Sequence, residues 1–211
     1  MFVTFEGGEG SGKSTQIKLF QEKLFEEKIL SLSTREPGST EIGKKIREVL
    51  LTPGNVIPGD AELLLYLADR VINYEKIIKP ALGNHFVVLC DRYIDSTIAY
   101  QGGGRRHGQL KVEALHALLN LSIKPDLTFL FDVDPLVGLV RSRSRLKSEG
   151  MINKESRFED EAIEFHSRVR ETYLALSEAE PERFHVIDTT YHEIQDVAYR
   201  VYLHFKKSNL I

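Results

Sequence analysis

The feature that most constrains this chain is a glycine-rich segment, GGEGSGKST, at residues 7–15. It matches the pattern G-x-x-x-x-G-K-[ST], with an apolar run before it and an amphipathic stretch, QIKLFQEKL, after it. This order predicts a strand, a turn of inward-facing backbone N–H groups and a helix N-terminus, which together bind phosphate oxygens. Lys13 is expected to reach the β and γ phosphates of a nucleoside triphosphate, and Ser14 to ligate Mg²⁺. The expected binding residues are Gly7, Gly8, Glu9, Gly10, Ser11, Gly12, Lys13, Ser14 and Thr15.

The rest of the chain alternates short apolar runs with amphipathic stretches, as in a doubly wound α/β fold with a five-stranded parallel sheet. Strands are expected at 2–5, 28–33, 85–91, 126–134 and 184–188. Helices are expected at 13–27, 41–51, 60–82, 110–121, 135–146, 160–179 and 191–207. We interpret 144–156, which has no sustained apolar period, as a mobile loop. A chain of 211 residues with 42% hydrophobic composition predicts one domain, 1–211.

Composition excludes several classes of protein. The formal net charge of -3 gives no basic field and no apolar run reaches the length of a membrane span, so we expect neither nucleic-acid nor membrane binding. The single cysteine, Cys90, lies in the apolar run FVVLC and is expected to be buried, and the N-terminus shows no secretion signal, so we expect a cytoplasmic protein. A guanine-reading Asn/Thr-Lys-x-Asp element is missing, because residues 153–156 lack the aspartate. Two classes remain, an enzyme that transfers the γ-phosphoryl group and a nucleotide-gated switch.

Charged side chains follow the predicted strands at their carboxyl ends, where ligands of an open α/β sheet bind. Asp91 ends the run FVVLCD and is the preferred metal ligand over Asp132 and Asp134, because Arg92 adjoins it. Arg35 ends the second strand. In LLYLADR, the spacing of four residues puts Tyr66 and Arg70 on one face of a helix. With Tyr100, these arginines and aromatics are predicted to face one pocket.

The order of these motifs resembles the thymidylate kinase family along nearly the whole chain. The matching segments are FEGGEGSGKSTQ, REPGSTEIGKKIREVLL, AELLLYLADR, DRYIDSTIAYQGGGR, KPDLTFLFDVDP, RFED and RVRETYLAL. The resemblance implies a nucleoside-monophosphate-kinase sheet in the order 2-3-1-4-5 and a homodimer formed through helices. It also implies phosphorylation of dTMP to dTDP with ATP and Mg²⁺.

The same resemblance assigns roles around the acceptor nucleotide. It implies that Arg70 and Arg92 hold the phosphate and base of dTMP, and that Tyr66 stacks on thymine where the family often has Phe. It implies that Thr97 and Gln101 contact the base or sugar and that Tyr100 excludes ribonucleotides. The carboxylate of Glu9, unexpected in a phosphate loop, then hydrogen-bonds the deoxyribose 3′-OH. The implied acceptor-binding set is Glu9, Arg35, Tyr66, Arg70, Arg92, Ser96, Thr97, Tyr100 and Gln101, with Ser14 and Asp91 at the metal.

A basic segment at about 141–158 is predicted to form a lid over the phosphates. Helical spacing puts Arg141 and Arg145 on one face and Arg143 roughly opposite. By resemblance to the bacterial type, whose phosphate loop lacks an arginine, the lid supplies the transition-state cation. Arg145 is the first candidate and Arg157 the second, with Arg141 expected to lie on adenine. The segment LKSEGMINKES departs from the family pattern R-x-R-x-R-G-E-L-D-R, and the expected catalytic set is Lys13, Arg92, Arg145 and Glu9.

Two alternatives to this function stay open at the level of sequence. One is a kinase that acts on another nucleoside or nucleoside monophosphate, and the other is a regulator that binds ATP without efficient transfer. The seven histidines show no metal-ligand spacing with cysteine or with one another, so we expect them to be scattered over surfaces or interfaces.

Overall fold

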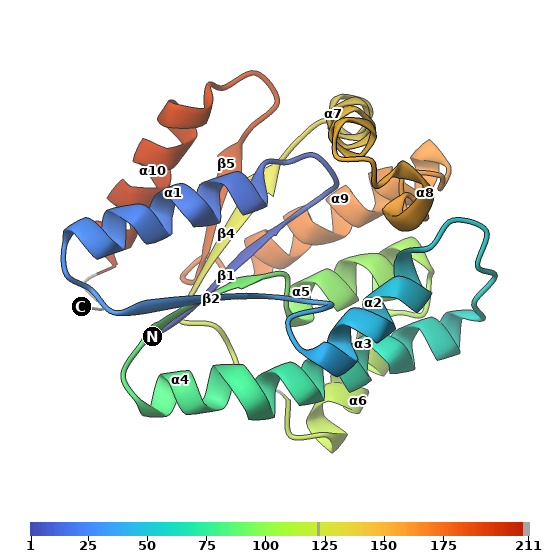
Figure 1. Ribbon diagram of the computed structural model, residues 1–211, viewed down its shortest axis with the longest axis horizontal. Helices are drawn as coiled ribbons and strands as arrows, with labels where there is room; N and C mark the ends of the chain where they lie inside the picture. The colour runs from blue at the N-terminus through green and yellow to red at the C-terminus, as the bar shows by residue number, and fades with distance from the viewer. Residues whose placement is uncertain (122, 209–211) are drawn as a thin grey trace.

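The computed structural model describes residues 1–121 and 123–208 and contains a five-stranded parallel sheet in the order β2-β3-β1-β4-β5 (Figure 1). The predicted fold class and strand order are thereby confirmed. All six residues of the central strand β1 are buried between its two neighbours, which is why its sequence reads as a nearly continuous apolar run. The strands are β1 Phe2–Gly7, β2 Ser31–Arg35, β3 Val87–Asp91, β4 Leu127–Asp132 and β5 Phe184–Asp188.

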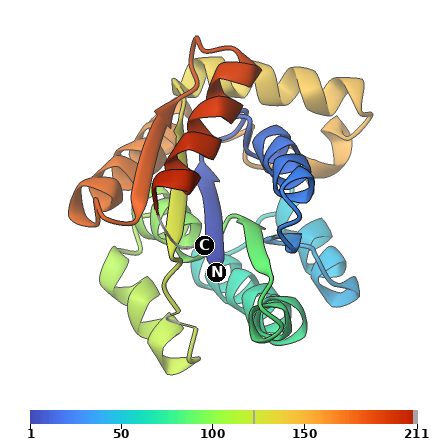
Figure 2. The same ribbon diagram turned by 90° about the vertical axis from the view of Figure 1, so that its left-hand side faces the viewer.

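Helices cover both faces of the sheet (Figures 1 and 2). On one face, α1 and α10 enclose a core of aromatic rings that includes Phe5, Phe20 and Phe205. On the other face, α3, α6, α9 and η2 pack around Leu67 and Tyr173. The helices are α1 Lys13–Glu26, α2 Glu41–Leu51, α3 Gly59–Asn73, the π-helix η1 Tyr74–Ile78, α4 Lys79–Gly83, α5 Ile94–Thr97, the π-helix η2 Ile98–Gly104, α6 Gln109–Leu118, α7 Pro135–Ser148, α8 Ile152–Glu155, α9 Ile163–Ala179 and α10 Ile194–Lys207.

The segment predicted as a loop at 144–156 is largely helical, so that prediction was wrong. Helix α7 continues to Ser148 because Leu146 is buried and extends its apolar side. The helix then ends in a Schellman motif, in which Gly150 has φ of 67° and the N–H of Met151 donates to the carbonyl oxygen of Leu146 at 2.8 Å. Helix α8 follows at once. The segment is therefore two helices joined by a tight turn.

The parallel arrangement brings the functional segments to one edge of the sheet. The glycine-rich segment follows β1, while Arg35 and Asp91 are the last residues of β2 and β3. Helix α7, which follows β4, packs directly on this segment, because a side chain on Gly10 or Gly138 would collide with the backbone of the other segment. No helix within the described residues is both long and apolar enough to cross a membrane.

Candidate functional site

A cavity of about 860 Å³ lies at this edge of the sheet and brings together nearly all of the predicted site residues. Its size falls within the usual range for ligand pockets. The predicted residues that line it are Glu9, Gly10, Ser11, Gly12, Lys13, Ser14, Thr15, Arg35, Tyr66, Arg70, Asp91, Arg92, Ser96, Thr97, Tyr100, Gln101, Arg141 and Arg145. Gly7 and Gly8, the first two residues of the glycine-rich segment, line a second, much smaller cavity instead.

The glycine-rich segment has the backbone of a phosphate-binding loop. Gly7, Gly10 and Gly12 have φ values of 138°, 65° and 91°, which side-chain-bearing residues rarely adopt. The ammonium group of Lys13 donates to the carbonyl oxygens of Gly7 and Gly8 at 3.0 and 2.7 Å and to the Ser11 hydroxyl at 3.0 Å. Burial lowers the pKa of Lys13 to about 8. The loop therefore holds a cation and inward-facing donors at the start of α1.

Ser14 and Asp91 place two oxygen atoms side by side at the edge of the cavity. The Ser14 hydroxyl donates to Oδ2 of Asp91 at 2.9 Å. A hydroxyl and a carboxylate at the mouth of a phosphate loop suit Mg²⁺, which prefers few protein oxygens together with phosphate and water. The competing candidates are occupied elsewhere, because Asp132 accepts hydrogen bonds from Nε and Nη2 of Arg170 and Asp134 caps α7. Across the described residues, no cluster of three His, Cys, Asp or Glu side chains forms another metal site.

Glu9, Arg92 and Tyr100 form a hydrogen-bonded group beside the loop. Oε1 of Glu9 accepts from the Tyr100 hydroxyl at 2.6 Å and from Nη2 of Arg92 at 3.2 Å. The guanidinium of Arg92 also stacks over the Tyr100 ring at 4.7 Å. Burial alone would raise the pKa of Glu9, but contacts with His166, Arg92 and Tyr100 outweigh it and lower the pKa to about 2. The Glu9 carboxylate is therefore ionised at neutral pH.

Glu6, which was not predicted as a site residue, binds the side chains that contact Arg92. Its carboxylate accepts hydrogen bonds from the backbone N–H of Tyr93 at 2.8 Å, from the Ser96 hydroxyl at 2.5 Å and from the Tyr173 hydroxyl at 3.0 Å. Burial raises the pKa of Glu6 to about 7. Since Ser96 and Tyr173 also contact Arg92, Glu6 fixes the two side chains against which that arginine packs. A polar residue inside the apolar strand FVTFEG was the available signal.

Arg70 lines the cavity but is largely committed to protein contacts. Its Nε donates to Oε2 of Glu36 at 2.6 Å, its Nη1 to the Thr97 hydroxyl at 2.8 Å, and its Nη2 to the backbone oxygen of Tyr93 at 2.8 Å. Nη1 also contacts Nε2 of His116, whose pKa burial and Arg70 together lower to about 3. A guanidinium has five N–H groups, so one remains for a ligand.

Aromatic and amide side chains complete the wall opposite the loop. Tyr66 and Phe158 face each other with ring centroids 6.5 Å apart, and both line the cavity. The side-chain amide of Gln101 donates to Oε1 of Glu62 at 2.9 Å, which fixes its orientation. The segment RFED had been matched to the family without a role for Phe158, whose place in the cavity wall only the fold reveals.

The lid arginines separate as helical spacing predicted. Arg141 and Arg145 line the cavity, whereas Nη2 of Arg143 donates to the backbone oxygen of Glu159 and Arg143 does not line it. Arg141 donates to the backbone oxygens of residues 189 and 190 at 2.9 and 2.7 Å, beside the loop after β5. Arg157, the second candidate for the transition-state cation, is held by Glu62 at 2.6 Å and does not line the cavity.

Two of the histidines were wrongly expected to be scattered over surfaces. His116 is fully buried against Arg70, and His166 is buried with its Nδ1 3.3 Å from Oε2 of Glu9. Arg70 and Glu9 lie far from these histidines in the chain, so no local spacing predicted the contacts. Cys90, in contrast, is buried as predicted.

Comparisons with known proteins agree with this geometry. A sequence model of the family described as thymidylate kinase matches residues 5–201. A curated thymidylate kinase from Desulforapulum autotrophicum is 48% identical over 189 residues, covering 89% of this chain and 83% of that protein. One from Pelobacter propionicus is 49% identical over 188 residues, covering 89% and 85%. The crystal structure of thymidylate kinase from Ehrlichia chaffeensis superposes with a TM-score of 0.76 at 34% identity, covering 98% of both chains.

Proposed function

The chain belongs to the thymidylate kinase family, which uses ATP to phosphorylate dTMP to dTDP, and we propose that its two nucleotides meet inside the large cavity. The observation that carries this proposal is that the phosphate loop and the arginine-bearing end of β3 line the same cavity. An acceptor phosphate held by Arg92 would therefore face a donor phosphate held by the loop.

At the acceptor end, the arginines differ in how many N–H groups they can offer to a ligand. Arg70 has one free N–H, which suits a carbonyl oxygen of the thymine base better than a phosphate. Arg92 and Arg35 supply the positive charge for the phosphate, with Ser96 beside Arg92. Tyr66 stacks on the base, and Thr97 and Gln101 line the base and sugar. Tyr100, fixed by Glu9, occupies the space of a 2′-hydroxyl, and Glu9 accepts from the 3′-OH.

At the donor end, the loop residues from Gly7 to Thr15 bind the phosphates of ATP, and Lys13 exchanges its carbonyl partners for phosphate oxygens. Arg141 lies beside the loop after β5 and covers the adenine base. Ser14 and Asp91 would hold Mg²⁺, which neutralises phosphate charge when bound. Arg145, on the cavity face of α7, supplies the second cation at the transferred group.

The reaction needs little covalent help from the protein. An acceptor phosphate already carries an oxyanion at neutral pH, so no side chain has to remove a proton from it. The work of the residues is to align donor and acceptor in line and to stabilise charge on the transferred group. Closure of α7 and α8 over the cavity would exclude water that would otherwise accept the phosphoryl group.

An assay with ATP, Mg²⁺ and a panel of monophosphates tests the function and its two alternatives. We expect rapid release of ADP with dTMP and far slower release with dCMP, UMP and ribothymidine monophosphate, because Tyr100 crowds the 2′ position. Preference for a different acceptor would identify another nucleotide kinase. Tight binding of ATP without acceptor-dependent turnover would identify a regulator.

We also propose that the enzyme is a cytoplasmic homodimer that associates through α2 and α3. Ile42 and Val49 on α2 and Leu64 on α3 are apolar and half exposed, at 50%, 46% and 57%. Sedimentation should give twice the chain mass of 24.1 kDa, and Leu64→Glu should reduce it to one chain. Phe25→Glu, at an exposed position on α1 across the sheet, is the matched control. A monomeric wild-type protein would contradict this proposal.

A further inference from the structure

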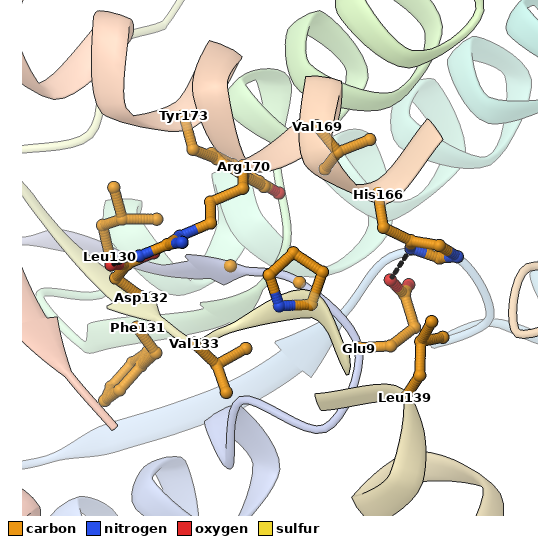
Figure 3. A pocket seen from close by; sticks show the side chains of 13 residues that line it. Glu9, Leu130, Phe131, Asp132, Val133, Leu139, His166, Val169, Arg170 and Tyr173 are labelled. Carbon is orange, nitrogen blue, oxygen red and sulfur yellow. Dashed lines mark hydrogen bonds and ion pairs between the residues drawn. The ribbon is translucent and has the colours of Figure 1, made fainter. Parts of the chain in front are cut away.

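Glu9 separates two cavities. Its front side lines the large nucleotide cavity, and its back lines the small cavity formed by Gly7, Gly8, Val133, Leu139, Val169 and His166 (Figure 3). His166 comes from the first turn of α9 and lines only this small rear cavity. A nucleotide in the large cavity would therefore meet Glu9 but not His166.

The two oxygens of Glu9 have different partners. Oε1 is shared by Tyr100 and Arg92 on the side of the large cavity. Oε2 is buried and accepts no hydrogen bond from any of the described residues. Nδ1 of His166 lies 3.3 Å from it. Replacing His166 with a side chain that places no polar atom here would leave this buried carboxylate oxygen without its polar neighbour.

The two ring nitrogens of His166 face different groups. Nε2 lies 3.0 Å from the backbone oxygen of Phe158, which can only accept a hydrogen bond. Nδ1 lies 3.3 Å from Oε2 of Glu9, a carboxylate whose pKa its neighbours lower to about 2. The ring therefore bridges the Phe158 carbonyl and the Glu9 carboxylate. The other charged groups around the carboxylate are Lys13, Arg92 and Glu159, and Arg170 on α9 is paired with Asp132.

We propose that His166 is a positioning residue whose ring, held between the Phe158 carbonyl and Oε2 of Glu9, fixes the Glu9 carboxylate for the acceptor nucleotide. Phe158 lines the large cavity and is the last residue of the predicted lid segment. The ring of His166 thus ties the phosphate loop to the end of that segment. This inference rests on the proposed function in assigning Glu9 to the acceptor.

Two amide variants of His166 test the roles of its two ring nitrogens separately. An asparagine amide reaches the position of Nδ1 and keeps a donor toward Glu9, whereas a glutamine amide reaches the position of Nε2 and keeps a donor toward Phe158. We expect His166→Gln to lower kcat with dTMP by about 10- to 100-fold with KM for ATP unchanged, and His166→Asn to retain most of kcat. His85→Asn is the control, since His85 is exposed and its φ of 61° is one that asparagine tolerates.

A double-mutant cycle shows whether His166 acts through Glu9. Glu9→Gln should itself lower kcat with dTMP, and adding His166→Gln to it should cost little more, because the carboxylate that His166 positions is already gone. Multiplying losses would overturn the proposal. So would equal falls in thermal midpoint for both His166 variants with kcat unchanged. A wild-type enzyme without dTMP turnover would instead refute the proposed function.

Discussion

Arg145→Gln should lower kcat for dTMP phosphorylation by about 10³-fold or more, the effect of removing an arginine that stabilises charge on a transferred phosphoryl group. Arg145 lines the large cavity from α7, and within the described part of the chain its guanidinium donates to the exposed Glu149 at 3.2 Å. This weak surface pairing leaves it available to a ligand. Because the cation acts in the transition state, KM for dTMP should change little.

Arg143→Gln is the matched control for this prediction. Arg143 lies two residues away on the same helix, but it donates to the backbone oxygen of Glu159 and does not line the cavity. Its kcat should stay near that of the wild type. If Arg145→Gln retained kcat while Arg141→Gln abolished it, the transition-state cation would have to be reassigned to Arg141. Steady-state kinetics with dTMP at saturating ATP decide between them.

Arg70→Gln should lower the thermal midpoint by about 6 to 20 °C, since breaking a buried ion pair costs about 3–5 kcal/mol and each kcal/mol shifts the midpoint of a chain this size by about 2–4 °C. Arg70 and Glu36 are 1% and 2% exposed and 2.6 Å apart. The variant leaves Glu36 as a buried charge that keeps only the amide of Asn73 as a donor. Differential scanning calorimetry measures the shift.

Lys79→Gln provides the comparison, because it breaks a salt bridge that is more than half exposed on both sides. Such a pair contributes about 1 kcal/mol or less, so the midpoint should barely move. A fall for Arg70→Gln no larger than this control would mean that Glu36 finds another partner and that the guanidinium does not hold this part of the fold together.

The parts of the site that the sequence predicted are those in which structure is local. The phosphate loop is nine consecutive residues between a strand and a helix, and its geometry follows from the positions of its glycines. Likewise, Arg141 and Arg145 face the cavity and Arg143 does not, because α7 is a regular helix whose faces can be counted. The strand order, in contrast, came from resemblance to a family and not from the apolar runs themselves.

The wrong predictions are of two kinds. Some involve contacts between residues far apart in the chain, and one involves a turn whose sequence signal was overlooked. His116 and His166 were dismissed because the side chains they contact, Arg70 and Glu9, lie in other elements. The turn at Gly150 failed for a different reason. Its signal was present in the sequence, as a glycine that comes four residues after Leu146 and just before Met151, but the segment lacks a sustained apolar period and was therefore predicted as a loop.

The close contact between Gly10 and Gly138 fixes the first turn of α7 against the phosphate loop, so any tilt of the helix would pivot there. Neither glycine leaves room for a methyl group, so the first turn of the helix is pinned to the loop while the far end is not. With a rise of about 1.5 Å per residue, Arg141 lies only about 4.5 Å along the helix axis from Gly138, and Arg145 lies about 10 Å from it. One small rotation therefore carries Arg145 more than twice as far as Arg141, so the proposed transition-state cation would move in and out while Arg141 stays near the proposed adenine site.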